Sequence, residues 1–187
     1  MLSGEWYGSN DCPGRQARWK VSNMNTFIRT ASERDLPAVK KLLGVCWHAT
    51  YDEIYGVERV SAITVDWHSL PSLKARLAKP YSELIVAEGP GGIVAMAYAS
   101  QSDPGFAVLH QLYILPEAQG RGLGAEMLAE IKAAFPDAKA MRLEVEAANE
   151  KAVRFYARCG FETISRTENC GEDESGIAAL VMQKTAR

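Results

Sequence analysis

The chain has 187 residues, of which 47% are hydrophobic and 24% are charged, and its 21 basic and 23 acidic residues leave a net charge of −2. A chain of this length can bury the core of one soluble domain without disulfide or metal staples. The balanced charge excludes a broad basic surface for nucleic acid, and no run of Lys and Arg indicates an anionic membrane as partner.

The cysteines form no C-x-x-C pair and the histidines are scattered, so we expect reduced thiols and no metal site. No run approaches the roughly 20 apolar residues that span a bilayer, and the N-terminus lacks the apolar centre of a signal peptide. We therefore expect a cytoplasmic protein.

Residues 1–23 show neither helical nor strand periodicity, whereas strongly patterned sequence follows Met24. We expect 1–23 to be an extension outside the core and 24–187 to form the domain. The alternative is a short arm whose Trp6 and Trp19 pack on that domain.

The patterned sequence opens with a predicted strand over 26–31 and a capping-box-like helix start at Ser32 and Asp35. An apolar stripe then predicts an amphipathic helix; its members are Leu36, Val39, Leu42, Leu43 and Cys46. We expect a second short helix within 47–68 and a third over 73–77.

The next elements predict a sheet. Residues 83–88 and 93–100 read as a hairpin joined by a glycine-rich turn, and 108–115 is apolar on both faces, as in a central strand covered on both sides. The remaining expected elements are a helix from Gly122 to Phe135, a strand over 141–147, a helix over 149–158, a segment over 161–167, a polar loop over 168–176 and a last strand over 177–183. This order predicts one mixed α/β domain.

A glycine-rich connection, Gly120-Arg121-Gly122-Leu123-Gly124, lies between the central strand and the helix that follows it. Bare backbone N–H groups at a helix N-terminus suit a phosphate or pyrophosphate. The spacing also fits a loose dinucleotide pattern, which would indicate an oxidoreductase. That pattern normally follows its strand directly in the first βαβ unit, and several strands come first here.

Two segments carry a family resemblance. Gln119-x-x-Gly122-x-Gly124 resembles the acyl-CoA pyrophosphate loop of the GNAT superfamily, the acetyl-CoA-dependent N-acetyltransferases. Residues 149–161 are similar to the family's N-x-x-A-x-x-F-Y-x-x-x-G-F helix, and the two motifs stand in the family's order. The chain is therefore identified as a member of this superfamily.

The resemblance implies an α/β fold with a mixed central sheet of about six to seven strands, helices on both faces and splayed central strands. It also implies acetyl-CoA as co-substrate, no metal, and a pantetheine arm bound to backbone groups in the splay. The cofactor-binding residues that it implies are Leu112, Tyr113, Ile114, Gln119, Gly120, Arg121, Gly122, Leu123, Gly124, Asn149, Ala152 and Phe155.

The resemblance further implies catalytic roles. Tyr156 matches the family's general acid, and Glu144 matches a glutamate base of the ribosomal-protein branch, with His110 as a substitute base or relay. Each role has an alternative. Tyr156 could be a core aromatic residue, Glu144 and Glu146 could only pair with nearby arginines, and His110 could be a core histidine. Cys159 has no histidine nearby in sequence, so we expect direct transfer in a ternary complex.

The acceptor pocket is expected to involve Trp47, His48 and Tyr51, since aromatic walls with acidic neighbours suit a cationic amine. Ordinary helix packing is the alternative. The expected partner is a primary amine of a small molecule or a protein N-terminus, not nucleic acid or membrane, and a homodimer is compatible with this function. The competing function is a noncatalytic acyl-CoA-binding sensor or interaction module.

Overall fold

The structure is a computed structural model that describes residues 26–103, 105–171 and 176–185. Its strands are β1 (Phe27–Thr30), β2 (Ser82–Gly89), β3 (Gly92–Asp103), β4 (Phe106–Ile114), β5 (Ala140–Glu146), β6 (Glu162–Thr167) and β7 (Ala179–Thr185). Its helices are α1 (Leu36–Tyr55), α2 (Val57–Trp67), α3 (Leu70–Ala78), α4 (Leu123–Ala133) and α5 (Glu150–Arg158), with short 3-10 helices at Glu33–Asp35 and Pro116–Ala118. The segment 1–23, expected to be an extension, lies outside the described residues.

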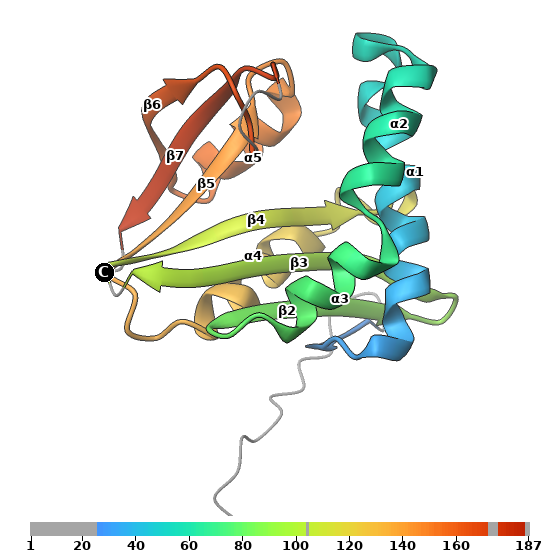
Figure 1. Ribbon diagram of the computed structural model, residues 1–187. Coiled ribbons are helices and arrows are strands. Elements are labelled where there is room, and N and C mark those ends of the chain that lie inside the picture. The colour runs from blue at the N-terminus through green and yellow to red at the C-terminus, as the bar shows by residue number, and fades with distance from the viewer. Residues whose placement is uncertain (1–25, 104, 172–175, 186–187) are drawn as a thin grey trace, which may run out of the picture.

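The strands form a seven-stranded sheet in the order β1-β2-β3-β4-β5-β7-β6 (Figure 1). Its neighbouring strands are antiparallel except for β4 and β5, which run parallel. The predicted mixed sheet is confirmed, and β4 is its central strand. The predicted hairpin is also confirmed as β2 and β3.

The sheet carries a hydrophobic core on each face. Successive residues of a strand point to opposite faces, and in β2 Leu84 and Val86 belong to a core with α1 and α3, whereas Ile85 and Ala87 belong to a core with α4 and α5. Figure 1 shows α3 in front of β2 and β3, with α4 behind β3 and β4. Helices on both faces were expected and are confirmed.

The first helix is longer than the sequence pattern predicted. We expected its stripe to end near Cys46 and a separate short helix within 47–68, but α1 continues to Tyr55 and α2 starts at Val57. The chain meets neither Gly nor Pro between Gly44 and Gly56, and Gly56, at φ +81°, is where the first helix stops. Aromatic residues therefore continue the helix instead of interrupting it.

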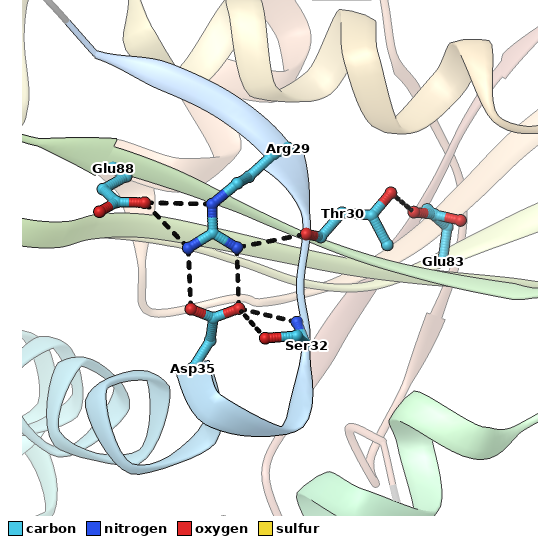
Figure 2. Close-up of polar contacts among 6 residues, drawn as sticks. All are labelled: Arg29, Thr30, Ser32, Asp35, Glu83 and Glu88. Carbon is cyan, nitrogen blue, oxygen red and sulfur yellow. Dashed lines mark hydrogen bonds and ion pairs between the residues drawn. The ribbon is translucent and has the colours of Figure 1, made fainter. Parts of the chain in front are cut away.

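A closed polar network holds β1 to β2 and to the start of α1 (Figure 2). The Arg29 guanidinium donates to both carboxylate oxygens of Asp35 at 2.8 Å and to Glu88 at 2.9 and 3.1 Å. Asp35 also accepts from the Ser32 backbone N–H at 2.7 Å and from its hydroxyl. The predicted helix start at Ser32 and Asp35 is thus part of a larger network, which the sequence pattern alone did not indicate.

The sheet opens between β4 and β5. Their parallel ladder joins residues 106–109 to 140–143, ending at the pair Leu109 and Leu143 (Figure 1). Beyond that pair the strands diverge, so 111–114 stay paired with β3 on one side alone, and His110 lies at a shift in the β3–β4 register. The splayed central strands that the resemblance implied are therefore confirmed. The faces of β4 were expected to be covered along its whole length, but 111–114 are only partly buried, because a pocket lies at the splay.

Candidate active site

A pocket of about 740 Å³ lies at the splay of the sheet. Its floor is β4 from Val108 to Tyr113, and its walls come from α1, α2, α3, β5 and α5. The residues that line it include Trp47, Tyr51, Trp67, His68, Arg76, Lys79, Tyr98, Glu144, Glu146, Asn149, Ala152, Tyr156 and Cys170. Segments far apart in the sequence therefore meet at the point where the central strands separate.

The α1 wall of the pocket is aromatic and rigid. The rings of Trp47 and Tyr51 lie 4.8 Å apart, and Trp67 packs edge-on against Trp47 at 5.6 Å. The indole N–H of Trp47 donates to the Tyr113 hydroxyl at 3.0 Å, which ties the helix to β4. Trp47 and Tyr51, both predicted to bind the acceptor, thus line the pocket.

The two predicted histidines lie in different places. His48 is outside the pocket lining, and its Nδ1 lies 2.7 Å from the Asp52 side chain one helical turn along α1. His110 does line the pocket; its Nε2 is 2.8 Å from the Ser100 hydroxyl and its ring stacks on Tyr98. The pocket lining therefore includes His110 but not His48. Trp67 and His68, which the sequence also suggested for the acceptor pocket, line it as well.

Tyr156 projects from α5 into the pocket lining and is largely buried. Its ring packs against Phe155 and Phe161 at 5.1 and 5.7 Å, which fixes its position. Burial, with smaller contributions from Tyr51 and Cys159, raises the pKa of Tyr156 above the usual range for a phenol. The hydroxyl therefore stays protonated at neutral pH.

Two carboxylates reach the pocket from the same face of β5. Glu144 is exposed and accepts a hydrogen bond from the Gly171 N–H at 2.8 Å. Glu146 is buried, and its carboxylate accepts from the Tyr55 hydroxyl at 2.6 Å. Of the arginines considered as partners for these glutamates, namely Arg142, Arg154 and Arg158, Arg142 donates to Gln183 and Arg154 pairs with Glu150.

The glycine-rich loop precedes α4, outside the pocket lining. Gly120 and Gly122 have φ of +80° and +88°, conformations that favour glycine. The N–H groups of Ala125 and Glu126 both bond the Gly122 carbonyl, so the amides before them are the ones that a helix N-terminus offers to an anion. A Cβ on Gly124 would lie 3.1 Å from Phe155, so this glycine allows α4 and α5 to approach closely.

Polar contacts connect that loop to β4 and α5. The Gln119 side chain donates to the Ile114 carbonyl at 2.9 Å and accepts from Lys151 at 2.5 Å. At the start of α5, the Asn149 side chain accepts from the Ala152 N–H at 3.1 Å. Leu112, Tyr113, Asn149 and Ala152 of the predicted cofactor set line the pocket, Leu123 is buried in the core, and Arg121 is exposed.

The acetyltransferase (GNAT) family model matches residues 38–161, well over half of the 187 residues. The chain belongs to the GNAT acetyltransferase family. The match begins inside α1 and ends after α5, so this GNAT segment includes β2 to β5, the glycine-rich loop and both motifs that the sequence suggested.

Curated relatives of this GNAT protein match over part of its length. An uncharacterized N-acetyltransferase of Mycobacterium tuberculosis is 34% identical over 88 residues, which are 46% of this chain and 56% of the relative. The uncharacterized N-acetyltransferase YhfO of Bacillus subtilis is 31% identical over 97 residues, 48% of this chain and 65% of the relative. The chain therefore spans less than two thirds of the length of these relatives.

Solved structures share the GNAT fold over most of the chain. The PaiA N-acetyltransferase of Thermoplasma acidophilum, in complex with coenzyme A, gives a TM-score of 0.76 at 21% identity, covering 87% of this chain and 100% of that one. The ribosomal-protein-alanine N-acetyltransferase of Brucella melitensis gives a TM-score of 0.65 at 23% identity, covering 85% of this chain and 99% of that one.

None of the helices in the described parts of this chain has the length and apolar character that a membrane span requires.

Several pocket residues of the GNAT domain escaped the sequence analysis. Arg76 and Cys170 carried no motif, and Glu146 was considered only as a surface charge. Tyr55, which is outside the pocket lining and donates to Glu146, was also missed. One signal was available: Trp47, Tyr51 and Tyr55 recur every four residues, so they lie on one face if the helix continues through them. Ending the stripe at Cys46 hid that face.

Proposed function

We propose that this protein is an acetyl-CoA-dependent N-acetyltransferase that transfers the acetyl group directly to a primary amine of a small molecule or a protein N-terminus. The observation that carries the proposal is the pocket at the splay of β4 and β5, where Tyr156 and two carboxylates meet beside open strand backbone. Family membership supports the same activity.

The residues present suit acetyl-CoA. The loop from Gly120 to Gly124 offers backbone amides at the N-terminus of an eleven-residue helix, where a pyrophosphate would be held. The half of β4 beyond Leu109 has no partner on its β5 side and would bind the pantetheine arm as an added strand does. PaiA, whose structure contains coenzyme A, has the same fold, which supports the use of acetyl-CoA by this chain.

Tyr156 is the proposed general acid. Its hydroxyl would protonate the departing thiolate. The raised pKa keeps this hydroxyl protonated at neutral pH and also makes it a weaker acid than a free phenol, so the transfer requires hydrogen bonding that lowers the pKa of Tyr156 once the cofactor is bound. Backbone N–H groups of the open half of β4 are available to stabilise negative charge on the carbonyl oxygen.

Glu144 is the proposed base for the ammonium of the acceptor. It lies at the pocket, keeps contact with solvent, and is held by the Gly171 N–H, so protons can leave through water. His110 is less suited, because desolvation and the charges of Lys79 and Arg76 lower its pKa to about 4, which makes it a weak base. We propose no covalent acyl-enzyme.

The test is release of free CoA thiol from acetyl-CoA across a panel of amines and N-terminal peptides with the purified chain. Amine-dependent release with formation of the acetylated acceptor supports the proposal. Tight binding of acetyl-CoA without turnover of any acceptor would support the noncatalytic sensor. Protection from thermal unfolding by NAD(P) but not by CoA would overturn both in favour of a dinucleotide-binding protein.

A further inference from the structure

The pocket has walls of opposite charge on the two sides of β4. One wall, which we call the acidic wall, consists of Glu144 and Glu146 on β5. The other, which we call the basic wall, consists of Arg76 of α3 and of Lys79, which is the first residue after that helix. In the sheet, β5 lies on one side of β4 and β3 lies on the other side. Helix α3 lies in front of β3 (Figure 1).

Arg76 is built into its wall. Its guanidinium donates to the Gln111 side chain on β4 at 3.2 Å and to the Trp67 carbonyl at the end of α2 at 3.1 Å. These contacts hold the positive charge of the guanidinium at the pocket. Lys79 is exposed beside it and also lines the pocket, so the wall carries two cations.

A buried polar atom supports a ligand near this wall. His68 is 1% exposed and lines the pocket, and its Nδ1 has no hydrogen-bond partner within the described part of the chain. Its ring is held between Trp47 at 5.6 Å and Tyr113 at 6.4 Å. Buried polar atoms in native proteins are normally satisfied, so this nitrogen suits a ligand group or a water that accompanies it.

The acidic wall is arranged for a cation. Glu146 is buried and keeps one oxygen on the Tyr55 hydroxyl, and the rings of Tyr51 and Tyr156 line the same part of the pocket. A carboxylate between aromatic rings binds an ammonium through charge and through the ring faces. Among the described residues that line the pocket, both carboxylates belong to this wall.

These observations separate acceptor classes. A diamine would place its second ammonium toward Arg76 and Lys79, and like charges across an interface oppose binding. An amine without a second charge would leave the basic wall unused. An amine that also carries a carboxylate or a phosphate meets both walls.

Resting on the proposed function, we propose that the acceptor is an amine that also carries an anionic group, bound by Arg76 and Lys79 while Glu146 holds the amine near Tyr156. The pocket then selects acceptors whose positive and negative groups lie on opposite sides of β4. The shared chemistry of the anionic group is a compact set of negatively charged oxygens, which a guanidinium binds in a fork.

The test compares acceptors of matched length. Initial rates are measured with acetyl-CoA and ω-amino carboxylates of two to six carbons, ω-aminoalkyl phosphates, diamines and n-alkylamines. We expect kcat/KM for the best anionic acceptor to exceed those of the matched diamine and alkylamine at least about tenfold, as charge-assisted hydrogen bonds allow. The carboxylate and phosphate series identify which anion is preferred.

Variants then assign the preference to the basic wall. Arg76→Gln should lower the kcat/KM advantage of the anionic acceptor about tenfold or more. The loss should come from a higher KM for the acceptor, with the KM for acetyl-CoA unchanged. Arg76→Glu should make diamines the preferred acceptors. If Arg76→Gln fails to fold, Lys79→Gln serves as the second variant; because Lys79 is exposed, it should fold, and it should lose a smaller part of the preference. Lys74→Gln on the same helix, where Lys74 pairs with Glu33, is the matched control and should change nothing.

The inference is overturned if the wild-type chain prefers diamines, if the classes do not differ, or if the Arg76 and Lys79 variants keep the wild-type ratio. Acceptor binding to the CoA-saturated chain, read as a thermal shift, gives a second measurement that needs no turnover. A thermal shift with anionic amines but no acetylation contradicts the proposed function and supports the inference about the acceptor. Acetylation of amines with no preference for anionic ones supports the proposed function and contradicts the inference.

Discussion

Two polar clusters of this molecule differ in how completely their groups are paired. In the Arg29 network, the guanidinium is shared between Asp35 and Glu88, and Asp35 also accepts from Ser32 (Figure 2). At the splay, strand pairing stops and a buried imidazole nitrogen has no partner within the described residues. The first cluster is complete without a ligand, whereas the second offers unused groups to one. Changes in the network should therefore alter stability, and changes at the splay should alter activity.

The largest expected effect is on turnover. Tyr156→Phe removes the hydroxyl proposed to protonate the thiolate and keeps the packed ring, so kcat should fall about 100-fold to 10,000-fold with little change in CoA affinity or melting temperature. Steady-state rates and thermal unfolding measure both. Tyr81→Phe, at an exposed tyrosine outside the pocket lining, is the control. Full activity of Tyr156→Phe over a pH series would remove Tyr156 from catalysis.

The second effect is on the glycine-rich loop. Gly122→Asp places a carboxylate where a pyrophosphate is expected, so CoA should bind about 100-fold more weakly by calorimetry, about 2.7 kcal/mol. Gly122→Asn is the neutral match, because Asn also adopts positive φ, and it separates charge from shape. Gly91→Asp, in the β2–β3 turn with open space around its Cβ position, is the control. Unchanged CoA affinity in Gly122→Asp would refute the loop assignment.

The third effect is on stability alone. Asp35→Asn weakens the bidentate contact to Arg29 and should lower the free energy of unfolding by about 2 kcal/mol, with kcat and KM unchanged. Chemical denaturation and steady-state kinetics test the two halves of this statement. Asp137→Asn, at an exposed position, should cost far less. A large loss of kcat in a folded Asp35→Asn chain would contradict the division between network and site.

The smallest effect near neutrality is the pH dependence of that network. The Arg29 guanidinium holds the pKa of Asp35 well below its usual value, so this carboxylate contributes stability above the unfolded pKa of about 3.9 and loses it as the pH falls further. The stability gap between wild type and Asp35→Asn should be constant from pH 7 to about pH 5 and narrow below about pH 4. A gap that stays constant to pH 3 would show that the pair does not titrate as described.

The same contrast explains what the sequence could predict. The proposed cofactor side depends on backbone conformation, so its glycines stand at a fixed spacing in the sequence, as at Gly122 and Gly124, and the sequence also predicted the helix that carries Tyr156. The proposed acceptor side depends on side chains that distant elements bring together. Arg76 reaches the pocket from α3, and the buried Glu146 on β5 is contacted by Tyr55 of α1. Neither contact leaves a local pattern.

The central claim is that the open half of β4 and the loop before α4 bind CoA through their backbone. Amide hydrogen exchange with and without saturating CoA tests this most directly. The account predicts slower exchange in peptides that cover 110–114 and 120–124, and unchanged exchange in β2. Saturation with CoA that leaves 110–114 and 120–124 unprotected, or that protects only other segments, would contradict it.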